Sequence, residues 1–103
     1  MNMNQRPFYT YYVAHVLKQY FTNKPPKNPS EVYTLNWQAA DKVIKSLPQR
    51  KQDILKDVYT SNDKQSMATK VYFTAEKFHE DNHAIWDIIS YTERRIAVER
   101  KLI

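Results

Sequence analysis

Apolar side chains recur along this chain every three or four positions, which is the period of an amphipathic helix. Prolines and short polar runs separate the periodic segments from one another. In the segment over residues 65–78, the β-branched and aromatic run Val71-Tyr72-Phe73-Thr74 leaves a short strand as the less favoured alternative to a helix. We therefore expect an all-α domain of four or five helices. The predicted helices cover about residues 7–22, 31–46, 47–60, 65–78 and 82 to nearly 103.

Residue types at the segment ends indicate where helices begin and how the chain is organised. Three prolines between residues 25 and 29 predict a stiff loop after the first helix. Ser30 and Asp81 are suited to cap the N-termini of the second and last helices. We expect residues 1–46 to form a helical pair that packs on residues 47–103, so that the chain is a single compact unit.

The second segment carries an apolar stripe that we expect to be buried, made of Tyr33, Trp37, Ala40, Ile44 and Leu47. The aromatic residues of the first half are expected to pack on one another and on the C-terminal helices. The reason is that short helices gain stability mainly by burying an apolar face. A partner-binding face in this half is the alternative.

Composition narrows the classes of protein that this chain can be. It has 103 residues and no glycine, which excludes glycine-rich phosphate loops and dinucleotide-binding turns. It has no cysteine, which excludes disulfides and thiolate metal sites. No apolar run approaches membrane-spanning length, and residues 1–6 lack the apolar core of a signal peptide. We therefore expect a cytoplasmic protein that does not bind membranes.

The chain is basic, and its positive charge is unevenly distributed. Sixteen Lys and Arg against eleven Asp and Glu give a net charge of +5. Residues 1–46 hold six cations and two anions, net +4, whereas residues 47–103 hold ten and nine, net +1. A basic balance permits binding to nucleic acid. In the second half, such binding would depend on locally placed cations.

Residues 79–83, His-Glu-Asp-Asn-His, match the H-E-x-x-H pattern, in which two imidazoles one helical turn apart bind zinc. The pattern needs one continuous helix, whereas Asp81-Asn82 favours a cap or a turn. A third ligand is also needed, for which Glu93 and Glu99 are the candidates. We expect no metal, no cofactor and no enzymatic activity, with a zinc hydrolase as an alternative.

A second pattern spans the same residues and fits a helix-turn-helix. In that motif a small residue of the first helix is followed by an apolar residue at +3 and, after the turn, by apolar residues near +9 to +11. Ala75, Phe78 and the run Ala84-Ile85-Trp86 occupy these positions, and His79-Glu80 forms the turn. The spacing therefore predicts two helices that cross closely around residue 80.

The second helix of such a motif presents side chains to DNA. Asn, Asp, His and Ser can donate to or accept from base edges, which predicts base contacts from Asn82, His83, Asp87 and Ser90. Contacts to the DNA backbone are expected from Trp86, Arg94 and Arg95.

These residues, with the motif at the start of the third segment, resemble a known family: the fourth conserved region of bacterial sigma factors. The similarity is closest to the sigma-like regulators of phages and mobile elements, including ArpU-like proteins, and covers about residues 47–103. The matching positions are Leu47-Pro48-Gln49-Arg50, Ile54-Leu55, Tyr59, Ala75-x-x-Phe78, Ala84-Ile85-Trp86, Ile96-Ala97 and Leu102-Ile103. His79-Glu80 stands where the family commonly has glycine or asparagine followed by isoleucine.

The resemblance implies that the L-P-x-R helix supports the fold and that the helix after the turn enters the major groove. It also implies RNA polymerase as a partner. We therefore expect a sequence-specific, DNA-binding transcription regulator that acts on double-stranded DNA. A homodimer would suit this function, because small helix-turn-helix proteins commonly bind two half-sites. The alternative is a helical protein–protein adapter, or an accessory factor of a mobile element, without specific DNA binding.

Overall fold

The computed structural model describes residues 7–22, 25–61 and 64–103, and these ranges contain five α-helices and no strand. The expected all-α fold is confirmed, and residues 71–74 are helical rather than a strand. Asn23 and Lys24 of the predicted proline loop, and residues 1–6, lie outside the described residues. The helices are α1 (Thr10–Thr22), α2 (Glu31–Lys45), α3 (Gln49–Thr60), α4 (Met67–Phe78) and α5 (Asn82–Glu99).

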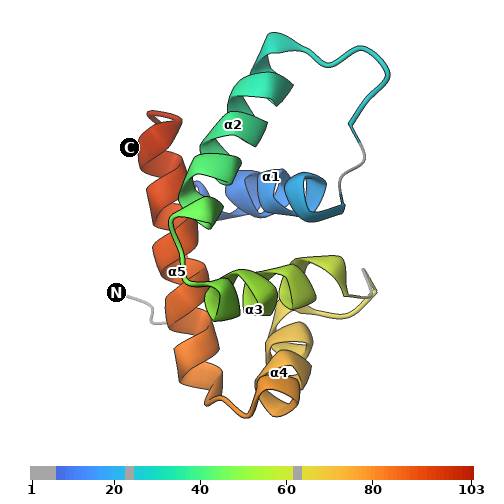
Figure 1. Cartoon of the computed structure of the whole chain (residues 1–103), viewed down its shortest axis with the longest axis vertical. Coiled ribbons are helices and arrows are strands. Elements are labelled where there is room, and N and C mark those ends of the chain that lie inside the picture. Colours follow the sequence, from blue (N-terminus) through green and yellow to red (C-terminus); the bar gives the residue numbers. More distant parts are fainter. Residues whose placement is uncertain (1–6, 23–24, 62–63) are drawn as a thin grey trace.

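The longest helix, α5, runs along one side of the molecule and joins its two parts (Figure 1). α3 and α4 lie beside its N-terminal half, whereas α1 and α2 lie beside its C-terminal half (Figure 1). α1 also packs on α3, and α4 packs on α3. The N-terminal half of α5 is therefore supported by α3 and α4.

α1, α3 and α5 are amphipathic, as the helical period predicts, and each buries one apolar face in a continuous core. That core includes Val13, Leu17, Ile54, Leu55, Ile85 and Ile89. α4 contributes Val71 and Ala75 to this core. Burial of these side chains removes apolar surface from water and holds the five helices together. The largest fully buried apolar side chains are Leu17, Ile54, Leu55, Ile85, Ile89 and Ile96.

The stripe predicted for α2 is wrong at its N-terminal end. Trp37 is 37% exposed, whereas Asn36 is only 8% exposed. Asn36 is turned inward because its side chain hydrogen-bonds Tyr12 of α1 and Arg100 after α5. Trp37 instead lies at the edge of the bundle, with its ring 5.4 Å from that of Tyr20. The C-terminal part of the stripe is buried as expected.

The predicted helix caps are confirmed. Ser30 Oγ accepts a hydrogen bond from the Tyr33 amide at 3.0 Å, and Asp81 Oδ1 accepts one from the His83 amide at 2.7 Å. Each cap gives a partner to an amide that the first turn of a helix leaves unpaired. Helix limits differ from the predicted ones by up to about four residues, since α1 begins at Thr10 rather than near residue 7 and α5 ends at Glu99 rather than near residue 103.

Candidate nucleic-acid interface

The connection between α4 and α5 is short and closed by two backbone hydrogen bonds. The His79 amide donates to the Glu76 carbonyl at 3.3 Å, and the Glu80 amide donates to the Ala75 carbonyl at 2.9 Å. This pair of bonds is a Schellman motif, whose central residue is left-handed. His79 accordingly has φ 56° and ψ 45°. Because the chain has no glycine, a histidine adopts a backbone conformation that glycine favours.

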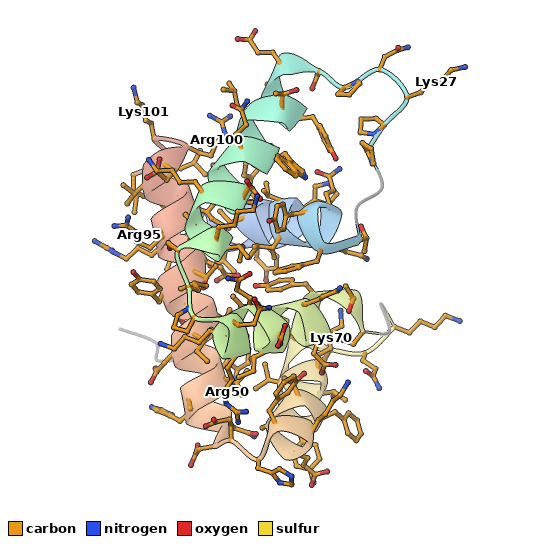
Figure 2. The ribbon with its side chains drawn as sticks, in the orientation of Figure 1. Lys27, Arg50, Lys70, Arg95, Arg100 and Lys101 are labelled. Carbon is orange, nitrogen blue, oxygen red and sulfur yellow. The ribbon has the colours of Figure 1, made fainter. Side chains whose placement is uncertain are left out.

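Arg50, in the first turn of α3, ties this connection to the rest of the bundle (Figure 2). Its Nε and Nη2 donate to Glu80 Oε1 at 3.2 and 2.9 Å. Nη2 also donates to the Phe78 carbonyl at 2.5 Å, and the guanidinium lies 5.8 Å from the centre of the Phe78 ring. One side chain therefore contacts the last residue of α4 and neutralises the carboxylate that follows it.

Asp57 of α3 makes a second set of side-chain contacts with α4. Its two oxygens accept hydrogen bonds from Thr74 Oγ1 at 2.7 Å and Lys77 Nζ at 2.8 Å. Burial raises the pKa of the Asp57 carboxyl, but the hydrogen bonds from Lys77 and Thr74 and the positive charge of Lys77 outweigh burial. The pKa therefore lies below its ordinary value, and Asp57 is a charged anchor for α4.

All seven side chains predicted to contact DNA lie on α5. Six are exposed: Asn82, His83, Asp87, Ser90, Arg94 and Arg95. Trp86 is half-buried and packs against the core. The spacing of His83, Asp87, Ser90 and Arg94 is four, three and four residues, which places them on one stripe of the helix.

The exposed stripe continues over residues that sequence reasoning did not single out. Tyr91 and Val98 are 54% and 44% exposed, and Lys101 is exposed just beyond the helix. The helical period counted from Asp87 is a sufficient signal for these positions, although tyrosine and valine are not residue types that indicate base or phosphate contacts. We define the outer face of α5 as His83, Asp87, Ser90, Tyr91, Arg94, Arg95 and Val98, all exposed. An 18-residue helix is about 27 Å long.

Charge changes along the outer face of α5. Its N-terminal part holds Asp87, with Asp81 at the start of the helix, whereas its C-terminal part holds Arg94 and Arg95. Figure 2 shows Arg95 and Lys101 projecting away from the bundle. The polar end of the face is therefore suited to hydrogen bonding, and the basic end to pairing with anions.

A hollow of about 440 Å³ lies between the start of α3 and the N-terminal half of α5. Lys51 and Asp87 line it together with the paired side chains of Arg50 and Glu80. The apolar part of its lining consists of Leu47, Ile54, Ala84, Ile88 and Tyr91. The hollow therefore borders the outer face of α5 and shares Asp87 and Tyr91 with it.

The residues of the H-E-x-x-H match do not form the geometry of a zinc helix. His79 follows α4 in a left-handed conformation, whereas His83 lies in the first turn of α5. Of the two candidate third ligands, Glu93 is buried and accepts a hydrogen bond from Tyr59, and Glu99 pairs with Lys42. Throughout the described ranges, no group of three His, Cys, Asp or Glu side chains is placed to hold a metal ion.

None of the described helices combines the length and apolar character needed to cross a membrane. No family model, no curated protein and no solved structure matches this chain. α5 and the residues that support it therefore carry the geometry and chemistry from which a function can be inferred.

Proposed function

We propose that this protein is a sequence-specific transcription regulator that binds double-stranded DNA, with α4 and α5 as a helix-turn-helix. The observation that carries the proposal is the outer face of α5, which is exposed along the helix while Ile85, Ile89 and Ile96 are buried opposite it. A single helix with one free face fits the major groove, which is about 12 Å wide. The net charge of +5 adds long-range attraction to DNA.

Under this proposal the two ends of α5 have different tasks. Asn82, His83, Asp87 and Ser90 contact base edges, because these side chains donate to or accept from the groups exposed in the major groove. Arg94 and Arg95 pair with phosphates and set the position of the helix along the duplex. Trp86 holds α5 against the core, in keeping with its half-buried side chain.

The supports of α5 favour the same function. Arg50 and Asp57 tie α4 and the turn to α3 through six side-chain contacts with Phe78, Glu80, Thr74 and Lys77. Base readout needs side chains held in a defined register, and a fixed turn supplies it. RNA polymerase remains the partner that the sigma-like resemblance implies. A second copy would bind a half-site about 34–36 Å away.

The test is selection of a randomised double-stranded DNA pool by the purified protein at about physiological salt. We expect one enriched motif, whose enrichment is lost in Asn82→Ala and His83→Ala. Each broken base contact weakens binding to the motif by about 1–3 kcal/mol. Arg94→Gln weakens binding to all sequences and lowers the salt slope by about one unit.

Matched controls come from exposed residues away from α5. Asn28→Ala and His15→Ala repeat the two alanine changes on the proline loop and α1, and Lys56→Gln likewise removes one positive charge, on α3. These variants retain the motif and the salt slope. A wild-type protein that enriches no motif contradicts the proposal.

The hollow between α3 and α5 favours a second candidate function, a protein–protein adapter. A hollow whose lining includes four aliphatic side chains and one exposed tyrosine accepts an apolar side chain of a partner. The adapter function predicts weak DNA binding with a small salt slope, which Asn82→Ala and His83→Ala leave unchanged. The same pool selection therefore distinguishes the two functions.

A further inference from the structure

The N-terminal helix has a second face that the core does not use. Phe8, just before α1, and Tyr11 and Tyr12 within it are 79%, 88% and 42% exposed. Their spacing of three and four residues places them on one side of the helix, and exposed His15 continues the row. Isolated exposed apolar residues are ordinary, but a contiguous aromatic row marks an interaction surface.

A partly buried hydrogen-bond network, centred on buried Asn36, connects this row to α2 and to the end of α5. Asn36 Nδ2 donates to the Tyr12 hydroxyl at 2.9 Å, and Arg100 Nε donates to Asn36 Oδ1 at 2.6 Å. Tyr12 and Arg100 thus share the side-chain amide of buried Asn36. The first turns of α2 add two exposed apolar residues, Val32 and Leu35. The aromatic row therefore lies in a corner where three helices meet.

Cations outnumber acids around this corner, although Glu31 in the first turn of α2 is an exposed acid. α1 contains no acidic residue, and Lys101 is exposed beside Arg100 (Figure 2). Glu99, the nearest acid along α5, pairs with Lys42 at 3.1 Å. Residues 1–46 carry a net charge of +4. At this corner the same surface of a second copy is therefore repelled, and an acidic partner is attracted.

We propose that the aromatic corner, defined as Phe8, Tyr11, Tyr12, Arg100 and Lys101, docks an acidic amphipathic segment of a partner protein. Apolar side chains of the segment pack on the three aromatic rings, and its carboxylates pair with the two cations. Tyrosine and arginine dominate the energetic centres of protein interfaces. Apart from Lys101, which continues the exposed stripe of α5, the residues of this surface share nothing with the outer face of α5.

Protein is favoured over nucleic acid by the balance of groups in the corner. Duplex DNA carries one phosphate per about 1.7 Å and is held mainly by rows of cations. Here three aromatic rings accompany two cations. The rings have no exposed base faces to stack on in a duplex, whereas they suit apolar anchors of a protein.

The experiment selects random 12-residue peptides displayed on phage against the full chain. We expect enriched peptides that combine carboxylates with aliphatic or aromatic residues. Synthetic copies of these peptides bind the Tyr11→Ser and Lys101→Glu variants with an affinity at least about tenfold lower than that for wild type, as loss of an interface anchor predicts. Phe73→Ser and Lys56→Glu, which change an exposed aromatic on α4 and an exposed lysine on α3, bind as wild type does.

Four outcomes overturn the proposal: no enriched peptide family, enriched peptides without acids, equal binding by all variants, or reduced binding by the control variants alone. Two parallel measurements identify another occupant. A dimer seen by sedimentation that is lost in Tyr11→Ser indicates a second copy. A single-stranded oligonucleotide whose binding is lost in that variant indicates nucleic acid. Because Tyr11 and Lys101 are exposed, we expect their substitution to leave the melting temperature unchanged. An unchanged melting temperature shows that each variant is folded.

Discussion

Replacing Arg50 with alanine tests whether one side chain fixes the connection between α4 and α5. The substitution removes the ion pair with Glu80, the hydrogen bond to the Phe78 carbonyl and the contact with the Phe78 ring. The Arg50 and Glu80 side chains are 56% and 33% exposed, so the ion pair is worth about 0.2–1 kcal/mol. The hydrogen bond is worth about 0.5–1.5 kcal/mol, and the ring contact about 0.5–1 kcal/mol. Arg50→Ala should therefore lower the free energy of unfolding by about 1–3.5 kcal/mol.

The assay is thermal and urea denaturation of the full chain. In a domain of this size, a loss of 2 kcal/mol lowers the melting temperature by about 8–16 °C. Glu80→Gln removes only the charge of the pair, so we expect a loss below about 1 kcal/mol. The double variant then measures the coupling between the two side chains.

The result that refutes this reasoning is an Arg50→Ala protein within about 0.5 kcal/mol of wild type, which is the range of ordinary surface substitutions. Hydrogen exchange adds a local measurement. If Arg50 holds the turn, the Glu80 amide, which donates to the Ala75 carbonyl, exchanges faster in the variant than in wild type. Equal exchange at this amide would contradict a role for Arg50 in holding the turn.

Three further predictions concern the same region. His79→Gly should raise the free energy of unfolding by about 0.5–1 kcal/mol, because glycine adopts the left-handed conformation without steric cost; a destabilised variant in urea denaturation contradicts this. Asp81→Ala should lower the free energy of unfolding by about 0.5–2 kcal/mol through loss of the helix cap. An unchanged urea midpoint would show that the cap does not stabilise the fold. The lowered pKa of Asp57 stabilises the fold fully above its ordinary value of 3.8, and this contribution is lost as the pH falls through the lowered pKa. Urea midpoints between pH 5 and 2 should therefore fall more steeply for wild type than for Asp57→Asn, and parallel curves would exclude this ion pair as a source of acid sensitivity.

The exposure of the candidate interface residues followed from local pattern. Once Asp81 is the cap of α5, the helical period places Ile85, Ile89 and Ile96 inside and leaves His83 and Arg94 outside. The same reasoning counted Trp86 as a surface residue, yet its side chain is half-buried. Whether a residue at the edge of an apolar face is buried or exposed depends on the neighbouring helices. The period of one helix contains no information about those neighbours. That these residues contact DNA remains a prediction.

Long-range contacts were beyond the reach of sequence reasoning. Nothing near Asn36 indicates that this polar residue is buried in place of Trp37, because its partners Tyr12 and Arg100 are 24 and 64 residues away. The aromatic residues of the first half were expected to be buried, and Tyr20 and Phe21 do pack on Trp37 and Tyr59. Phe8, Tyr11 and Tyr12 instead project outward, because α1 has one side to bury and these rings lie on the other.

The sequence by itself determined the all-α class, the helix caps and the inward faces of α1, α3 and α5. These features depend on residues within about four positions of one another, which is the range of helical periodicity and capping. The tertiary structure alone decided how α2 is rotated, that Arg50 neutralises Glu80, and that α1 keeps an aromatic face outside the core. These features depend on which helices meet in space, and residues 30 positions apart, such as Arg50 and Glu80, become neighbours only when the helices pack.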